Sequence, residues 1–503
     1  MTLHRFLAAV LVGLCIACTE TAGAAANPEG AEHTPYRHTV ERAGRFGGEA
    51  VRYRAIVAET FLEDESGKPT ASIVSISYVR TDGRRNAERP VIFVFNGGPG
   101  SASLWMHMGF AGPRRVDFGD DIRPETAPPF RLADSEESLL DVADLVFFDP
   151  PGTGFSRILP DGKPEQYYGV QQDARATVDF IRSWIREHGR WNSPRFLMGE
   201  SYGTIRAAVV AKLLAGGPFG TGRMDGITLN GVILLGQAMD MRGAGRDLRY
   251  VNSLPSLAAT AWYHGRVDRE GTSLTAHVEA ARRFAAREYR DALFAGWDLD
   301  EAARRRVADR LSALIGIPAP ELVERNLRMS NGEFAERLLA SAGQEVGMYD
   351  SRFVLPLAGD GDDPVADDPA MGQYVPGYVA AVNLYLRGEL GVQLDRDYDA
   401  IEFRRVNARW DYGQGGPGNY AEDLAVAARR NPALRVFVGT GWYDLVTTVG
   451  SAEYTLAHSG IERERVRFRH YESGHMPYLG PDSRRALAHD LRRFVRGELP
   501  PAD

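Results

Sequence analysis

Five apolar runs, each ending in a loop of small or polar residues, constrain the fold of this chain more than any other feature. They are PVIFVF before NGGPG, ADLVFF before DPPGTGFS, RFLM before GESYG, GVILL before GQAMD, and LRVFV before GTGWYD. Helical stretches such as QQDARATVDFIRSWIREHG lie between several of them. Buried strands that alternate with helices form a mostly parallel sheet with helices on its faces. The sequence therefore predicts an α/β fold with a mostly parallel central sheet.

The order of these elements predicts a core in two parts, separated by an insertion. Residues 47–81 alternate apolar and polar side chains around the turn DESGKP, which predicts antiparallel strands. Residues 241–425 instead carry apolar residues at helical spacing, with abundant arginine and glutamate. We expect residues 27–240 and 426–503 to form the α/β core. Residues 241–425 are expected to form a helical cap that packs over the carboxyl ends of the strands and walls the pocket.

The N-terminus has the pattern of an export signal. A basic start, MTLHR, precedes the apolar FLAAVLVGLCIAC and the small residues of TETAGAAA. We expect residues 1–26 to be cleaved and the mature chain to be periplasmic or secreted. Cys15 and Cys18 lie in or beside this leader, so the mature chain has no disulfide. A lipid anchor on Cys18 is the alternative, and no later run is long and apolar enough to span a membrane.

Charge and composition exclude some classes of function. The net charge of -8 argues against a nucleic-acid-binding protein, which needs a basic face to displace counterions. Five aspartates cluster between residues 360 and 368, but their spacing does not fit a calcium-binding EF-hand loop. A solvated acidic loop is the favoured interpretation of Asp360, Asp362, Asp363, Asp367 and Asp368. We expect neither a metal ion nor an organic cofactor, and the oligomeric state stays open.

The segment RFLMGESYGTIRAAVVAKLL places a serine between a strand and a helix. Gly-x-Ser-x-Gly suits a strained strand-to-helix turn, in which the glycines let neighbouring backbones approach the serine. Ser201 would then stand above the sheet at a helix N-terminus, where the helix dipole favours developing negative charge. The alternative is an ordinary serine that caps the helix. The flanking strand and helix favour a nucleophile.

A nucleophilic serine needs a base, and the base needs an orienting carboxylate. In folds with this turn the chain order is serine, acid, histidine. Asp444 follows a buried strand in LRVFVGTGWYD, and His475 lies in the shaped loop SGHMP. His470 remains a reserve base and Asp350 a reserve acid. His458 and His489 lie in helical patterns typical of the surface.

The loop NGGPG could bind a phosphate, bind a dinucleotide or form part of an oxyanion hole, and its residues favour the third function. A phosphate-binding loop of the P-loop type would continue to a lysine, and NGGPGSASLW contains none. A dinucleotide fingerprint needs Gly-x-Gly-x-x-Gly, which this loop does not give. Paired with a nucleophile, the loop is better interpreted as part of an oxyanion hole. The backbone N–H groups of Gly98 and Tyr202 would hold the transient negative charge.

Together NGGPGSAS, DPPGTGFS, GESYG, GWYD and SGHMP resemble, in order and approximate spacing, the motifs of the serine carboxypeptidase family. The resemblance runs from about residue 90 to residue 480. It implies an α/β-hydrolase fold with a helical insertion and an enzyme that removes C-terminal residues from peptides. It also implies Ser201 as nucleophile, His475 as general base and acid, and Asp444 as orienting acid, with Gly98 and Tyr202 as oxyanion donors.

The resemblance further implies that Asn96 and Glu200 bind the terminal carboxylate of a peptide substrate. Glu200 could do so only when protonated, because two carboxylates in contact repel each other. The alternative for Glu200 is a structural hydrogen bond. The loop DPPGTGFS either lines the pocket or only shapes a turn.

Departures from the family pattern affect the substrate side more than the triad. Phe110 replaces a glutamate that many members have, so a second carboxyl near Glu200 is expected to be missing. Val94 replaces a tryptophan. An esterase or acyltransferase with the same triad therefore remains an alternative. A catalytically silent binding protein is the alternative of another class.

Overall fold

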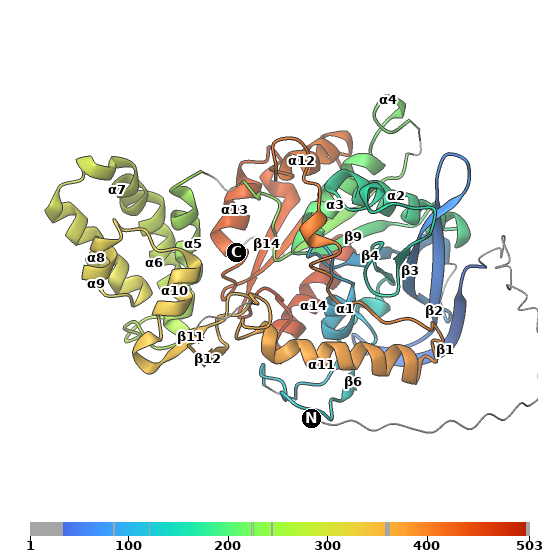
Figure 1. The fold of residues 1–503 in the computed structure, drawn as a ribbon, viewed down its shortest axis with the longest axis horizontal. Coiled ribbons are helices and arrows are strands. Elements are labelled where there is room, and N and C mark those ends of the chain that lie inside the picture. The colour runs from blue at the N-terminus through green and yellow to red at the C-terminus, as the bar shows by residue number, and fades with distance from the viewer. Residues whose placement is uncertain are drawn as a thin grey trace, which may run out of the picture. The chain divides into compact units, whose positions relative to one another are not determined.

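A ten-stranded sheet forms the centre of the protein, and its strands follow the apolar runs of the sequence (Figure 1). The computed structural model describes residues 34–83, 86–119, 121–222, 224, 226–242, 245–357 and 363–498. The expected signal peptide, with Cys15 and Cys18, lies outside these residues. Contacts divide the chain into Met1–Pro35 and Tyr36–Asp503, and the second unit contains the sheet and its helices.

The strands of the central sheet are β1 (Arg37–Phe46), β2 (Glu49–Glu63), β3 (Pro69–Arg80), β4 (Val91–Phe95), β7 (Asp144–Phe148), β8 (Arg157–Ile158), β9 (Arg195–Glu200), β10 (Gly231–Leu235), β13 (Arg435–Gly441) and β14 (Val466–Tyr471). Their order is β1-β2-β3-β7-β4-β9-β10-β13-β14, with β8 paired to β3. The first three strands and β7 pair antiparallel, and every pair from β7 to β14 is parallel. The mostly parallel sheet predicted from the sequence is confirmed.

Two short hairpins lie outside this sheet. They consist of β5 (Arg114–Val116) with β6 (Leu132–Asp134), and β11 (Gln344–Val346) with β12 (Val354–Pro356). The main helices are α1 (Leu104–Met106), α2 (Val170–Glu187), α3 (Tyr202–Leu214), α4 (Pro218–Thr221), α5 (Leu248–Tyr263), α6 (Leu274–Phe284), α7 (Arg290–Ala295), α8 (Glu301–Ile315), α9 (Ala319–Glu324), α10 (Asn331–Arg337), α11 (Met371–Asn383), α12 (Ala421–Arg430), α13 (Val449–Ala457) and α14 (Pro481–Val495).

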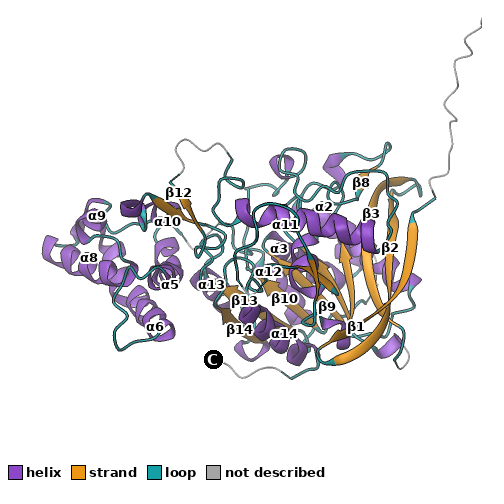
Figure 2. Ribbon diagram, turned by 90° about the horizontal axis from the view of Figure 1, so that it is seen from below, coloured by secondary structure: helices purple, strands orange, loops and turns teal. Residues whose placement is uncertain are grey.

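Helices cover both faces of the sheet, and each face has its own apolar core (Figure 2). Side chains of α2, α3, α12 and α13 pack on one face, and side chains of α1, α11 and α14 pack on the other. Alternate residues of the strands supply the two cores, because successive side chains of a strand point to opposite faces. Ile92 and Val94 of β4 join the second core, whereas Phe93 and Phe95 join the first.

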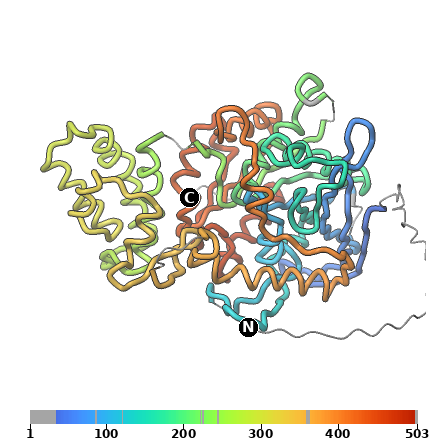
Figure 3. Tube along the Cα trace, in the orientation of Figure 1, coloured from blue at the N-terminus to red at the C-terminus, as the bar shows by residue number. Residues whose placement is uncertain are grey.

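The block 241–425 consists of two different parts. Helices α5 to α10 bury a separate apolar core, which Leu445 joins from the sheet side, and α5 packs against α13. The second part, which contains α11, returns to the sheet and joins its core. The colour change from green through yellow to orange in Figure 3 follows this path. The boundaries at residues 241 and 425 stay a prediction.

The helices that the structure describes include no candidate for a membrane span. None of them combines the length and the apolar character that a membrane span requires.

Candidate active site

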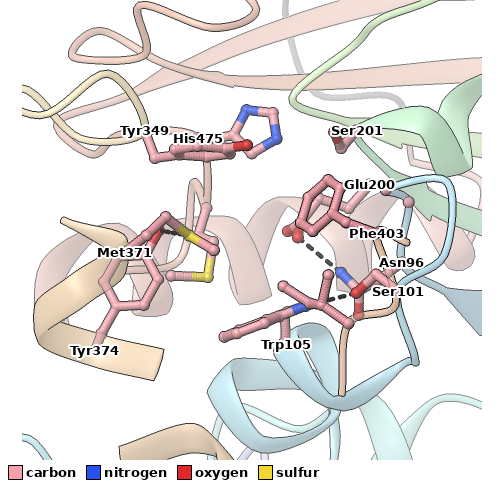
Figure 4. Close-up of a pocket in the computed structure, with 14 residues that line it drawn as sticks. Asn96, Ser101, Trp105, Glu200, Ser201, Tyr349, Met371, Tyr374, Phe403 and His475 are labelled. Atoms are coloured by element: carbon pink, nitrogen blue, oxygen red, sulfur yellow. Dashed lines mark hydrogen bonds between the residues drawn. The ribbon is translucent and has the colours of Figure 1, made fainter. Parts of the chain in front are cut away.

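A cavity lies at the carboxyl ends of β4 and β9, and the motifs of the sequence converge on it (Figure 4). Its lining includes Ser201, His475, Asn96, Glu200 and Gly98. The remaining lining residues are mostly apolar or aromatic: Gly97, Ser101, Trp105, Tyr349, Met371, Tyr374, Ile401, Phe403 and Met476. Parallel strands end at one edge of the sheet, so residues far apart in sequence meet there.

The serine stands on a strained turn between β9 and α3. Ser201 has φ 59° and ψ −129°, a conformation that a non-glycine residue rarely adopts. Its N–H donates to Leu235 O on β10 at 3.0 Å, which holds the turn against the next strand. A Cβ atom on Gly199 would lie 2.2 Å from Gly203 O, so the turn needs glycine at this position. The predicted strand-to-helix turn is present.

His475 and Asp444 meet through a hydrogen bond, although each lies on its own loop. His475 Nδ1 donates to Asp444 Oδ2 at 2.9 Å, and both side chains are buried. A carboxylate only accepts, so Nδ1 carries the proton of neutral His475 and Nε2 keeps its lone pair. Nε2 has no hydrogen-bond partner among the described residues, and the imidazole lines the same cavity as Ser201. This tautomer is the one that can accept a proton from a serine.

Thr447 donates further hydrogen bonds to the carboxylate of Asp444. Its hydroxyl donates to Asp444 Oδ2 at 2.5 Å. The other oxygen, Oδ1, accepts the backbone N–H groups of Val446 and Thr447 at 2.8 Å each. These three donors, together with His475, fix the orientation of the Asp444 carboxylate.

Two opposing effects set the pKa of His475. Burial lowers it, because charged imidazolium loses its hydration. The Asp444 carboxylate, its hydrogen bond and the negative charge of Glu200 raise it, and the net result is a pKa above the ordinary value. The imidazolium that forms during proton transfer is therefore stabilised.

The loop after β4 brings a second set of backbone N–H groups beside the serine turn. A Cβ atom on Gly97 would lie 2.5 Å from Tyr202 N, which shows how closely the loop approaches the start of α3. Tyr202 is the first residue of α3, so its N–H has no partner within the helix. Gly98 lines the cavity with φ +103°. Gly98 thus lines the cavity with Ser201, and Tyr202, the other residue predicted from the sequence, directly follows the serine.

Asn96 and Glu200 form a buried pair on the floor of the cavity. Asn96 Nδ2 donates to Glu200 Oε1 at 2.7 Å, and Asn96 Oδ1 accepts the N–H of Met106 at 3.2 Å. The second carboxyl oxygen of Glu200, Oε2, is buried and has no hydrogen-bond partner among the described residues. The pair predicted from the resemblance is brought together, and one oxygen of Glu200 is left for another group.

Burial raises the pKa of Glu200 to about 7. The positive charge of His475 and the Tyr478 hydroxyl, which lies nearby, lower it, whereas the charge of Asp444 raises it. Phe110 stacks on Tyr478 with ring centroids 5.7 Å apart. Tyr478, stacked on Phe110, thus lies beside Glu200, and burial is the largest influence on the pKa of Glu200.

His470 and Asp350, the reserve base and reserve acid predicted from the sequence, have partners outside the Ser201 site. His470 Nδ1 contacts Thr440 Oγ1 at 2.7 Å, and its Nε2 lies 3.0 Å from Glu453. Asp350 is bound by Arg352 through two hydrogen bonds. Neither residue lines the cavity. His458 and His489 are exposed.

The sequence did not predict several residues of the site. Thr447 follows Asp444 by three residues, a spacing that is typical of an aspartate whose side chain accepts backbone N–H groups of the following turn, so its position had a local signal. Tyr349, Met371 and Phe403 had none, since the chain returns to the site from the insertion only through long-range packing. The loop DPPGTGFS contributes no lining residue and shapes a turn, with Asp149 accepting from Ser103.

The acidic stretch acts on the backbone in its described part. Asp363 Oδ1 accepts the N–H groups of Val365 and Ala366. Asp368 accepts from Ala370 and Met371 through one oxygen and from Met348 through the other. Asp360 and Asp362 lie outside the described residues. Asp368 thus ties the start of α11 to the chain that follows β11.

Comparisons with known proteins give one family match and a shared fold. Residues 74–293 match the family model described as serine carboxypeptidase, a range that contains NGGPG and GESYG but ends before Asp444 and His475. Among curated protein sequences no relative matches the chain.

Solved structures resemble this chain at low sequence identity. The prohormone-processing carboxypeptidase Kex1 from Saccharomyces cerevisiae is 14% identical, with 89% of this chain and 92% of that chain covered and a TM-score of 0.57. A thermostable carboxyl esterase from Bacillus coagulans is 14% identical, with 87% and 97% covered and a TM-score of 0.36. The first of these supports the expected α/β-hydrolase fold.

The family match covers the serine turn and the glycine loop, and the shared fold extends over the rest of the core. Over residues 74–293 the chain is similar to the serine carboxypeptidase family of hydrolases.

Proposed function

We propose that this protein is an exported serine carboxypeptidase that removes the C-terminal residue of peptides through an acyl-enzyme intermediate. One observation carries the proposal: the Asn96–Glu200 pair and Ser201 line the same cavity, and Glu200 directly precedes Ser201. A carboxylate bound by this pair lies close to the nucleophile. The bond that is cleaved is then the last peptide bond of the substrate.

In the proposed reaction Ser201 Oγ attacks the carbonyl carbon of the last peptide bond, and His475 Nε2 takes the hydroxyl proton. The N–H groups of Gly98 and Tyr202 stabilise the oxyanion of the tetrahedral intermediate. His475 then gives its proton to the leaving nitrogen, the C–N bond breaks, and the C-terminal amino acid departs. Water, deprotonated by His475, attacks the acyl-enzyme ester and releases the shortened peptide.

Glu200 is proposed to bind the substrate's terminal carboxylate in its protonated form. Its Oε2 would donate a hydrogen bond to that carboxylate, and the second N–H of the Asn96 amide would donate another. A neutral carboxyl avoids the repulsion between two carboxylates. The raised pKa of Glu200, about 7, supports this role.

The experiment compares matched peptides that differ only at the C-terminus. We expect hydrolysis of the free-acid peptide and at least 100-fold slower hydrolysis of its C-terminal amide, because the amide cannot bind as a carboxylate. A fluorophosphonate probe should label the wild type and not Ser201→Ala. Equal hydrolysis of both peptides would favour the esterase or acyltransferase alternative, and an unlabelled wild type would favour the silent protein.

Export is a separate part of the proposal, supported by the sequence of residues 1–26 alone. Expression in a Gram-negative host followed by cell fractionation and intact-mass analysis tests it. We expect a periplasmic chain that lacks about 26 residues. A lipid-modified Cys18 would indicate the anchored alternative, and a full-length cytoplasmic chain would contradict export.

A further inference from the structure

The turn between β11 and β12 lies between the two loops that carry Asp444 and His475. We call residues 347–353 the hairpin tip. β11 and β12 pair antiparallel with Val346 opposite Val354, and Gly347 N donates to Phe353 O at 3.0 Å. The tip belongs to the predicted insertion, far in sequence from either loop.

The hairpin tip holds both neighbours of the acid. Ser351 N donates to Tyr443 O at 3.0 Å, and Leu445 N donates to Met348 O at 3.0 Å. Asp444 therefore lies between two backbone hydrogen bonds to the tip. These bonds fix the backbone from which its carboxylate projects.

The hairpin tip also holds the histidine. The backbone N–H of His475 donates to Tyr349 O at 2.6 Å. The Tyr349 ring meets the imidazole edge to face, with centroids 5.4 Å apart and an interplanar angle of 83°. Figure 4 shows these two rings side by side at the edge of the cavity. The backbone carbonyl and the ring of Tyr349 thus set the position and the plane of the His475 imidazole.

Arg352 of the hairpin tip binds the backbone on both sides of the histidine. Its guanidinium donates to Glu472 O at 2.8 Å and to Leu479 O at 3.1 Å, and it contacts Ser473 Oγ at 3.4 Å. The residue is only 5% exposed, and its charge is balanced by Asp350, which accepts two hydrogen bonds of 2.9 and 2.6 Å. A buried arginine without such a partner would be strongly destabilising.

Backbone contact between the tip and the histidine loop is unusually close. A Cβ atom on Gly474 would lie 2.5 Å from both Asp350 Cβ and Tyr349 O. Only glycine at this position lets the tip approach His475. The glycine of SGHMP is thus required by the tip.

The hairpin tip is itself anchored to the insertion. His264, which follows α5, donates through Nε2 to Ser351 O at 2.6 Å, and the hydroxyls of Thr260 and Ser351 lie 2.6 Å apart. Met348 N donates to Asp368, which also binds the start of α11. The tip is therefore held from the cap side while it holds the two loops.

We propose that the hairpin tip, fixed by the Arg352–Asp350 pair, is the positioning element that keeps Asp444 and His475 in hydrogen-bonding register. Asp444 follows β13 and His475 follows β14, and the direct backbone bonds between their loops, Trp442 N to Tyr471 O and Tyr443 N to Ser473 O, end before both residues. The hairpin tip forms backbone hydrogen bonds with both of these loops. Asp350 and Arg352 are positioning residues that act through His475 and Asp444. This inference rests on the catalytic roles in the proposed function.

The test uses Arg352→Lys, Arg352→Met and Asp350→Asn in the full-length protein, with steady-state hydrolysis of a free-acid peptide. A shift of about 1 Å in catalytic geometry costs roughly 100-fold in rate. We expect kcat to fall roughly 10- to 100-fold in Arg352→Met, and less in Arg352→Lys, which keeps the charge. KM should change less than about threefold, because Asn96 and Glu200 do not contact the tip through any of the hydrogen bonds above.

The pH profile of kcat separates positioning from mere stability. A loosened Asp444–His475 hydrogen bond should move the acid limb of kcat to lower pH in Arg352→Met and Asp350→Asn. Arg190→Met provides the matched control. Arg190 is also buried and is paired to Asp144, but it precedes β9, and Asp144 begins β7, so the pair lies at the end of these strands opposite the cavity. We expect a comparable loss in Tm with unchanged kcat and pH profile.

Two outcomes would overturn the inference. One is a folded Arg352→Met variant with wild-type kcat and pH profile, and the other is an equal loss of kcat in Arg190→Met. If Arg352→Met does not fold, Arg352→Lys and Asp350→Asn decide by the same criteria. Ser201→Ala is measured in parallel: activity in that variant would refute the proposed function itself, whatever the tip variants do.

Discussion

The side-chain amide of Asn96 donates a hydrogen bond of 2.7 Å to the carboxyl of Glu200. The two residues are 104 positions apart but end neighbouring parallel strands, because β4 pairs with β9. An amide donor stabilises a charged carboxylate, yet burial outweighs it and raises the pKa of Glu200 to about 7. Glu200 can therefore be neutral at mildly acidic pH and donate a hydrogen bond, which ordinary glutamate cannot.

The first prediction concerns the pH dependence of KM. Glu200 is protonated below its pKa of about 7 and charged above it, so binding of a free-acid peptide should weaken as pH rises from 6 to 9. KM should rise by roughly tenfold per pH unit well above that pKa. Glu200→Gln keeps a permanent donor, so its KM should be level over this range. A level KM in the wild type would remove Glu200 from carboxylate binding.

The second prediction concerns the pH dependence of kcat. His475 accepts a proton only when neutral, and its pKa is raised above the ordinary value of about 6.5. kcat should therefore fall as pH decreases through this raised pKa. Glu200 and His475 influence each other, so apparent pKa values from the profile belong to the pair. With an ester substrate that lacks a carboxylate, kcat should rise with pH and then stay level. A decline of kcat above neutral pH with that ester would contradict the assignment.

The third prediction concerns the triad. Ser201→Ala and His475→Ala should each lower kcat by roughly 10⁴- to 10⁶-fold without loss of the fold, since the residues act as a unit. Asp444→Asn should lower kcat by roughly 10⁴-fold, because the amide favours the wrong tautomer of His475. Steady-state kinetics with circular dichroism as folding control measures this. Near-normal turnover in His475→Ala would move the base elsewhere.

The fourth prediction concerns the oxyanion loop. The added methyl in Gly97→Ala would lie 2.5 Å from Tyr202 N and 2.7 Å from Glu200 O, so the loop must move away from the serine turn. Loss of one oxyanion donor costs roughly 100- to 1,000-fold in kcat. Gly332→Ala on α10 is the control, because its methyl would meet nothing within 4 Å. Equal, small effects of both substitutions would contradict a role of this loop in catalysis.

The fifth prediction concerns the substrate side chain. Trp105, Met371 and Met476 line the cavity, and among its lining residues only Glu200 and His475 are acidic or basic. An apolar wall does not compensate a buried charge. Peptides that end in leucine or phenylalanine should therefore show kcat/KM at least tenfold above peptides that end in lysine or glutamate. A peptide library read by mass spectrometry measures this, and a preference for charged C-terminal residues would refute it.

The sequence by itself determined the fold class and the order of the chemical motifs. Apolar runs of four to six residues, each followed by a loop of small residues, predicted parallel strands whose ends meet at one edge, because periodicity and glycine content are local properties. The strained turn at Ser201 followed from its two glycines and its flanking strand and helix. Asp444 and His475 followed from chain order once that turn was recognised.

The tertiary structure alone decided how the insertion divides and what aligns the acid with the histidine. Helices α5 to α10 bury their own core, whereas Tyr349, Met371 and Phe403 return to the cavity. Asp350 was a reserve acid by sequence, and the structure places it against Arg352 instead of a histidine. The hairpin tip contacts Tyr443 and His475, which lie about a hundred residues further along the chain. Local sequence patterns do not encode such contacts, because they arise only when distant segments pack together.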